Sequence, residues 1–152
     1  MNKDSNDANA ALAEPWRRLW NGDLGQLDAI VAEDFVTHAA LMAGTGDDIL
    51  RGRGALGEWI RGMHAMMASL LFTVEVGPIT NADHLVIRWR VRGTYRGGLP
   101  GAPDTAIGRE ISFTGTDILR VVEGMLAEYW VNSDTLLLMQ QLGIGAAAPS
   151  AQ

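Results

Sequence analysis

A chain of 152 residues with 47% hydrophobic residues, no cysteine and a net charge of −6 is expected to form one globular domain. The negative charge argues against nucleic acid and anionic membranes as partners. The lack of cysteine excludes disulfides and cysteine nucleophiles. No apolar run approaches the roughly 20 residues that span a bilayer, and the polar start MNKDSNDANA lacks a signal-peptide core, so we expect a cytoplasmic protein.

The first half of the chain is predicted to be mainly helical. Residues 1–8 indicate a disordered tail, and a single domain is expected over 9–143, followed by a loose tail over 144–152. Apolar residues at helical spacing predict helices over about 9–21 and 24–32, and a third from the segment Arg51–Gly54 to about Leu70. Between them, Phe35–Ala40 is predicted as a short strand that carries His38, and Gly44–Asp48 as a loop.

The second half of the chain is predicted to be a meander of four antiparallel strands. Expected strands cover 71–80, 84–95, the stretch from Arg109 to Val122, and Met125–Val131. A Gly/Pro loop over 96–108 separates the second from the third, and a final short helix begins at Asp134 as its N-cap. This order predicts an α+β fold, with helices on one face of a curved antiparallel sheet that wraps around a long helix and leaves a cone-shaped pocket.

One acidic residue interrupts the buried row of the third predicted strand. Alternate residues from Ile111 to Val121 are apolar or small except Asp117, and a bare buried charge is too costly to be left without partners. Desolvation would raise the pKa of this carboxyl from about 4 toward about 6, which suits proton transfer near neutral pH. The alternative is a carboxyl satisfied by backbone groups, or a bulge at Gly115 that turns Asp117 outward.

His38 is the second candidate for chemistry, as a base that partners Asp117. The alternative is a structural histidine at the pocket rim or on the surface. A further set of aromatic and methionine side chains is predicted to line a cavity for a flat apolar ligand, or else to form an ordinary core. This set consists of Trp59, Met63, Met67, Trp89, Tyr95, Phe113 and Trp130.

Other chemistries find little support in the sequence. The three histidines are scattered without the spacing of a metal site, and Asp47-Asp48 lacks the rest of a calcium loop. The motif Gly52-Arg53-Gly54 lacks the remaining glycine of a dinucleotide fingerprint, and no serine lies in a nucleophile elbow. We therefore expect neither a metal ion nor a cofactor.

Several segments together resemble the SnoaL-like polyketide cyclase (ester cyclase) family. They are WNGDLGQLDAIVAEDFVTH, RGRGAL, GTYRGGLPG, GREISFTGTDILRVVEGMLAEYW and QQLG, and they extend from about Trp16 to Gly143. The resemblance implies the cone-shaped nuclear transport factor 2-like fold and a homodimer. The same fold carries isomerases, epoxide hydrolases, dehydratases and non-catalytic modules, so the fold alone does not fix the chemistry.

The sequence departs from the family at two positions that carry chemistry. In the cyclases a His and an Asp in the pocket run a cofactor-free aldol closure. The His lies three residues before the Arg that matches Arg120, which is Asp117 here, and the Asp follows the Trp of a Glu-x-Trp motif, which is Val131 here. Ketosteroid isomerases also resemble this hairpin, with an Asp at the place of Asp117 as a neutral donor and a base close to the place of His38.

The resemblance therefore implies a cofactor-independent cyclase or isomerase that acts on a polycyclic or aromatic carbonyl compound through an enol or enolate. In that hypothesis His38 removes a proton beside the carbonyl and Asp117 donates to the enolate oxygen. The alternative is a non-catalytic small-molecule-binding or dimerisation module of the same fold. Water addition to an epoxide ranks below both, because the inward face of the Leu85–Tyr95 strand offers no acid.

Overall fold

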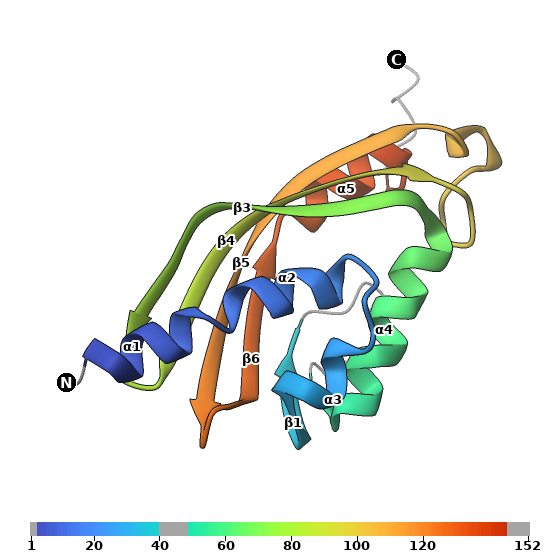
Figure 1. Cartoon of the computed structure of the whole chain (residues 1–152). Helices are drawn as coiled ribbons and strands as arrows, with labels where there is room; N and C mark the ends of the chain where they lie inside the picture. The colour runs from blue at the N-terminus through green and yellow to red at the C-terminus, as the bar shows by residue number, and fades with distance from the viewer. Residues whose placement is uncertain (1–2, 40–48, 146–152) are drawn as a thin grey trace.

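A computed structural model of the chain describes residues 3–39 and 49–145, in which helices cover one face of a single bent sheet (Figure 1). The predicted α+β fold class is confirmed. In chain order the elements are α1 (Lys3–Ala10), α2 (Ala13–Trp20), α3 (Gln26–Ile30), β1 (Val31–His38), β2 (Ile49–Arg51), α4 (Arg53–Met66), β3 (Met67–Asn81), β4 (His84–Tyr95), the 3-10 helix η1 (Asp104–Ala106), β5 (Glu110–Val122), β6 (Met125–Ser133) and α5 (Thr135–Leu142).

The described strands form one sheet in the order β2-β1-β6-β5-β4-β3. Strands β3 to β6 are the predicted antiparallel meander. The sheet is not antiparallel throughout, because β1 joins the free edge of β6 in parallel, and β2 then pairs antiparallel with β1. A parallel neighbour requires a long crossover connection, which the rest of the chain supplies between β1 and β6.

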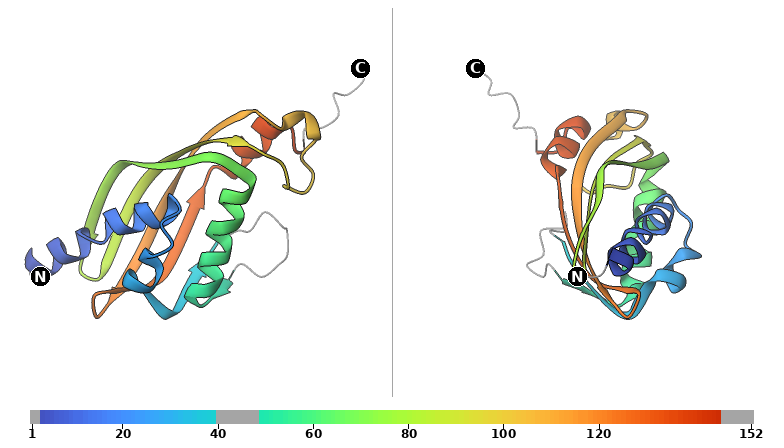
Figure 2. Two further views of the ribbon diagram at one scale, coloured as in Figure 1. Left: turned by 45° about the vertical axis from the view of Figure 1, so that its right-hand side comes forward. Right: turned by 60° about the vertical axis from the view of Figure 1, so that its left-hand side comes forward.

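Helices α1 to α4 lie on one side of the sheet, as the right-hand view of Figure 2 shows. Helix α2 buries Ala13, Trp16, Leu19 and Trp20, which recur at intervals of three and four residues and so share one face of the helix. One cluster of buried residues extends from Ala13 to Leu142. The inner face of the sheet and the apolar face of α2 therefore enclose the same core.

Several element boundaries differ from the predictions. Lys3–Ala10 forms helix α1 where a disordered tail was expected, and Asn9 Nδ2 at its end donates to Ala82 O at 3.0 Å. Helix α4 ends at Met66, not Leu70, because Met67 already pairs with Tyr95 as the first residue of β3. Met67 and Leu70 are buried at an interval that also fits a helix, so periodicity could not separate the end of α4 from the start of this irregular strand.

The last helix follows the prediction closely. Asp134 caps α5, since its Oδ1 accepts a hydrogen bond from Leu137 N at 3.1 Å. The predicted loop Gly44–Asp48 lies outside the described residues, as does the tail predicted over 144–152 apart from its first two residues. No helix in the described ranges is long and apolar enough to cross a membrane. The cytoplasmic location stays a prediction.

Candidate functional site

Asp117 points into the core from the middle of β5. Its neighbours of the same parity, from Ile111 to Val121, are also buried, and the carboxyl residue itself is only 2% exposed. Strands β4 and β5 pair without a register shift through Trp89 and Gly115, so Gly115 forms no bulge in this ladder. The alternative in which Asp117 turns outward is therefore wrong.

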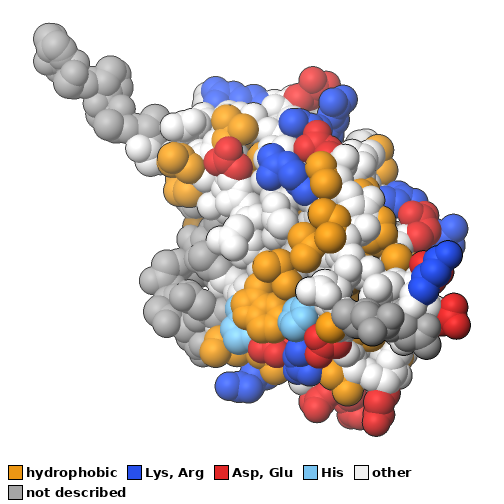
Figure 3. Space-filling model, turned by 90° about the vertical axis from the view of Figure 1, so that its left-hand side faces the viewer, with side chains coloured by type: hydrophobic (Ala, Val, Ile, Leu, Met, Phe, Trp, Pro, Cys, Tyr) orange, Lys and Arg blue, Asp and Glu red, His pale blue; other side chains and the backbone are white. Residues whose placement is uncertain are grey.

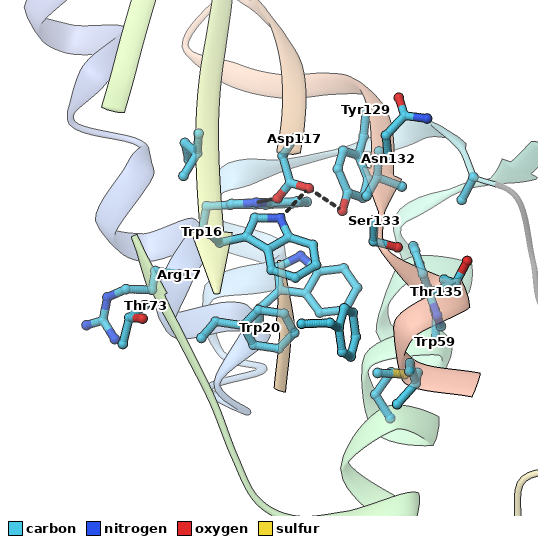
Figure 4. A pocket seen from close by; sticks show the side chains of 18 of the residues that line it. Trp16, Arg17, Trp20, Trp59, Thr73, Asp117, Tyr129, Asn132, Ser133 and Thr135 are labelled. Carbon is cyan, nitrogen blue, oxygen red and sulfur yellow. Dashed lines mark hydrogen bonds between the residues drawn. The ribbon is translucent and has the colours of Figure 1, made fainter. Parts of the chain in front are cut away.

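Three side chains donate hydrogen bonds to this carboxyl group, and no two come from the same element (Figure 4). Trp16 Nε1 in α2 donates to Oδ2 at 2.9 Å. Trp89 Nε1 in β4 and the Tyr129 hydroxyl in β6 donate to Oδ1 at 2.8 and 2.9 Å. The partners of Asp117 are thus side chains from three separate parts of the chain, and the hydrogen bonds tie α2 to the sheet.

The Asp117 carboxyl has an unusual acidity for its residue type. Burial raises its pKa from 3.8 to about 6, although the hydrogen bonds from Trp16, Trp89 and Tyr129 act in the opposite direction. Burial and the nearby Asp117 charge raise the pKa of Tyr129 well above its usual value, so this hydroxyl keeps its proton and remains a donor. Both protonation states of Asp117 are accessible near neutral pH, as general acid–base catalysis requires.

Asp117 borders a mainly apolar cavity of about 290 Å³ between the helices and the sheet. Seven aromatic side chains line it, namely Trp16, Trp20, Trp59, Phe72, Trp89, Phe113 and Tyr129. A smaller set of polar side chains also lines it, namely Arg17, Thr73, Asn132, Ser133 and Thr135. A cavity of this kind suits a flat apolar molecule with a few polar substituents.

The loop over 96–108 covers part of this cavity. Its Leu99 lines the cavity, and the backbone N–H of Leu99 donates to the Tyr95 hydroxyl at 2.9 Å. Arg96 N donates to Met66 O at 2.7 Å, which fixes the start of the loop to the end of α4. The loop therefore does more than connect β4 with β5.

Four of the seven predicted lining residues border the cavity, namely Trp59, Met63, Trp89 and Phe113. Met67 and Tyr95 are each 2% exposed and belong to the core without lining the cavity. Trp130 lies on the opposite face of the sheet, since it pairs with Ile118 whereas Asp117 pairs with Val131. The expectation that Trp130 lines the cavity is therefore wrong.

His38 also lies on the outer face, away from Asp117. It pairs with Trp130 across β1 and β6, and the two rings stack with their centroids 5.2 Å apart and their planes at 7°. His38 Nε2 is 2.7 Å from Glu128 Oε2. The hydrogen bond from His38, followed by the one from Arg120, lowers the pKa of Glu128. The structure does not bring the predicted His38–Asp117 pair together, so the two residues cannot share one substrate.

Trp16, Trp20 and Tyr129 line the cavity but were not predicted as site residues from the sequence. Both tryptophans lie in the helix predicted over 9–21, but the helical spacing gave no indication that one indole N–H would meet an acid about a hundred residues further along the chain. Tyr129 would have followed from the correct hairpin register, because it shares the inward parity of Val131. Among the described residues, no group of three or more His, Asp or Glu side chains could hold a metal ion.

Comparison with solved structures supports the architecture. TsrD from Streptomyces laurentii aligns with a TM-score of 0.76 and 24% identity, over 94% of this chain and 98% of that protein. IdmH from Streptomyces antibioticus, named for a proposed polyketide cyclase activity, aligns with a TM-score of 0.76 and 26% identity, over 90% and 99%. AclR from Streptomyces galilaeus, named for a proposed hydroxylase activity, aligns with a TM-score of 0.75 and 21% identity, over 91% and 82%.

No curated protein matches the sequence. The family model described as the SnoaL-like domain matches residues 13–129, from the start of α2 to the middle of β6. This range contains Trp16, Trp89, Asp117 and Tyr129, and so the whole hydrogen-bonded centre of the cavity. The chain belongs to the SnoaL-like domain family, within the nuclear transport factor 2-like superfamily.

Proposed function

We propose that the protein is a cofactor-independent enzyme that acts on a polycyclic or aromatic carbonyl compound, as a cyclase or isomerase, through an enol or enolate. The observation that carries this proposal is a carboxyl group with a pKa of about 6 at the wall of an aromatic cavity. As a carboxylate, Asp117 removes a proton from the carbon beside the carbonyl group. As a carboxylic acid, it returns that proton to the product.

The nature of the cavity supports the substrate class. Rings on several sides favour a flat aromatic molecule, which would stack on them or meet them edge to face. The name of IdmH points to the same class of substrate. In our proposal, Trp59, Met63 and Phe113 bind the apolar body of the ligand, while Asp117 is the catalytic residue.

Asp117 acts without a second acid in this proposal. Val131 lies directly opposite it and lines the cavity where the family resemblance implies an aspartate. His38 lies on the other face of the sheet. One carboxyl group therefore both removes and returns the proton, which an isomerisation or an intramolecular closure allows when the two carbon atoms lie on the same side of the ligand.

The test is hydrogen–deuterium exchange at the carbon beside the carbonyl group of 2-tetralone in heavy water, followed by NMR. The wild-type protein is expected to accelerate the exchange, and Asp117→Asn to lose that acceleration. Glu128→Gln is the matched control, because it neutralises a carboxyl group on the outer face of the same sheet. Equal acceleration by wild type and Asp117→Asn would reject Asp117 as the proton carrier.

A second candidate function is a binding module without catalysis. Val131 in place of an acid favours it, and so do the three side-chain hydrogen bonds that Asp117 already accepts within the protein. In that case 2-tetralone would bind in the cavity, as seen from shifts of the tryptophan indole signals, while its exchange rate stayed at that of buffer.

We also propose that two copies of the chain pair through the outer face of the sheet. A row of side chains crosses this face in register, from Trp130 through Ile118 and Val86 to Ile79. Ile118 is 39% and Ile79 is 55% exposed, and Figure 3 shows a hydrophobic stripe with histidine and charged side chains beside it. Sedimentation should give a dimer for the wild type and a monomer for Ile118→Arg, and a wild-type monomer would reject the pairing.

A further inference from the structure

The two oxygens of the Asp117 carboxyl group have unequal surroundings. Oδ1 accepts hydrogen bonds from Trp89 Nε1 and the Tyr129 hydroxyl, whereas Oδ2 accepts one, from Trp16 Nε1. A carboxylate oxygen has two lone pairs that accept hydrogen bonds. Both positions on Oδ1 are therefore occupied, and one position on Oδ2 remains.

We infer that Asp117 meets its ligand through Oδ2 alone, and that Trp89, seated on Gly115, is a positioning residue that keeps Oδ1 out of the reaction. This inference rests on the proposed function and specifies the ligand group involved. That group is a single hydrogen, carried either by the carbon beside a carbonyl or by the hydroxyl of the corresponding enol. A ligand that offers only an acceptor at this point would not be recognised by the carboxylate.

The proton transfer balances at this one position. The lone pair on Oδ2 forms an O–H bond as the C–H bond beside the carbonyl breaks. The electron pair of the C–H bond enters the enolate, and the negative charge passes from Asp117 to the ligand oxygen. Return of the same proton from Oδ2 to carbon restores the carboxylate, so no other reactant is needed.

Gly115 makes the position of Trp89 possible. The two residues are direct cross-strand neighbours on β4 and β5, and a Cβ atom at Gly115 would lie 2.2 Å from the nearest ring atom of Trp89. The indole therefore occupies the space that any other residue at 115 would fill. From there its N–H reaches Asp117, two residues along the same strand.

The Trp89 ring has little freedom to move elsewhere. It packs edge to face against Phe72 and Phe113, with ring centroids 5.2 and 5.9 Å away, and is 8% exposed. A methyl group at position 115 must therefore displace the ring as a whole, and with it the N–H. Gly115→Ala is expected to break the hydrogen bond to Oδ1 while leaving every donor group chemically intact.

The experiment compares two probes that differ in one hydrogen-bond donor, 2-naphthol and 2-methoxynaphthalene. Their dissociation constants are measured about two pH units above the titration midpoint of Asp117, so that the carboxylate is ionised. The hydroxyl of the first probe donates to Oδ2, and the methyl ether cannot. Because hydrogen bonds to charged groups are worth about 1.5–3 kcal/mol, the wild type should prefer 2-naphthol by about tenfold or more.

We call the hydrogen bond from Trp89 Nε1 to Asp117 Oδ1 the Oδ1 clamp. Its loss should reduce the preference for 2-naphthol at least about fivefold, because the carboxyl group can then rotate away from the probe. Gly115→Ala and Trp89→Phe test this in two ways, the second without adding volume, in case the first fails to fold. Gly54→Ala is the control, since a Cβ at Gly54 in α4 has no atom within 4 Å. An unchanged preference in folded Gly115→Ala and Trp89→Phe would overturn the inference.

Asp117→Asn separates this inference from the proposed function. If Asp117→Asn loses the preference while both clamp variants keep it, the carboxylate binds the probe and only the positioning role fails. If the wild type shows no preference, or binds neither probe, the inference and the proposed function fail together. If all three variants lose the preference and Gly54→Ala keeps it, the positioning role of Trp89 on Gly115 is supported.

Discussion

Asp117 and Val131 lie directly opposite each other on β5 and β6, and both line the cavity. Directly opposed residues in an antiparallel pair have Cβ atoms about 4.5–5.5 Å apart, close enough for two charges to interact strongly. An acid at position 131, as the family resemblance implies, would therefore share its surroundings with Asp117. In this chain an apolar side chain leaves Asp117 without a neighbouring carboxyl group on that strand.

Val131→Asp is expected to create a coupled pair of acids. Because two carboxylates in one buried site cannot both ionise easily, one titration midpoint should rise above the value of about 6 for Asp117 alone. Carbon-detected NMR of the side-chain carboxyl signals measures both midpoints. Val131→Asn is the control for polarity without charge, and a single midpoint unchanged from wild type would contradict the expectation.

The stability of the protein should depend on pH through Asp117. Its folded pKa of about 6 exceeds the ordinary 3.8, so the folded state holds the proton more tightly than the unfolded chain. The contribution is fully present below the unfolded pKa and is lost as the pH rises through the folded pKa. At about 1.4 kcal/mol per pKa unit, the loss amounts to about 3 kcal/mol.

Urea unfolding of wild type and Asp117→Asn over this pH window isolates the effect. The difference between their free energies of unfolding should shift by about 3 kcal/mol against the wild type as the pH rises. Surface pairs such as Glu14 with Arg17 are common to both proteins and cancel in the difference. Parallel pH profiles would mean that Asp117 titrates at the same pH in the folded and unfolded states.

Two tryptophans of α2 offer a matched comparison of hydrogen bonding. Trp16 and Trp20 are 2% and 5% exposed, but only Trp16 donates to Asp117, and Trp20 Nε1 finds no acceptor among the described residues. Replacement by Phe removes similar volume from each site. Trp16→Phe should therefore lower the free energy of unfolding by about 1–3 kcal/mol more than Trp20→Phe.

Chemical denaturation at a pH above the Asp117 midpoint measures this difference. The difference in free energy of unfolding between Trp16→Phe and Trp20→Phe should narrow at low pH. There Asp117 is protonated, and the lost hydrogen bond no longer involves a charge. If Trp20→Phe lowers the free energy of unfolding as much as Trp16→Phe or more, ring packing, and not the hydrogen bond to Asp117, determines the stability of this helix face.

Strong local patterns made much of the fold predictable. The alternation along β5 located Asp117 on the inner face, and the spacing in α4 placed Trp59 and Met63 toward the cavity. The Asp134 cap and the bounds of β4 also followed from local residues. These features depend on neighbours in the chain, which the sequence displays directly.

Trp130 and His38 were predicted on the wrong face of the sheet because of a single register shift between β5 and β6. Val122 pairs with Met125 and Val121 with Leu126, but Arg120 pairs with Glu128, so β6 carries one extra residue at this point. Continued without the shift, the ladder would place Trp130 opposite Asp117. A one-residue bulge reverses the face of every later side chain, and no glycine or proline within β6 marks it.

His38 follows the same reversal, because β1 aligns it with Trp130 on the outer face. His38→Gln is therefore expected to leave the 2-tetralone exchange rate within about twofold of wild type, since a surface substitution outside the cavity has little effect on its geometry. The change should instead appear locally. The hydrogen bond from His38 makes the largest contribution to the lowered pKa of Glu128, so losing or weakening that bond in the variant should raise the pKa of Glu128 toward its ordinary value.

Both measurements on His38→Gln are needed to place this residue. A raised Glu128 midpoint with an unchanged exchange rate fits a histidine whose role is confined to the outer face. A tenfold or greater loss of exchange, in a variant that folds like wild type, would restore His38 to the chemistry and would require the sheet to open beside Trp130. Arg120→Gln is the control for a change at Glu128 that does not involve His38. It removes the other hydrogen bond to Glu128 on the same face of the sheet.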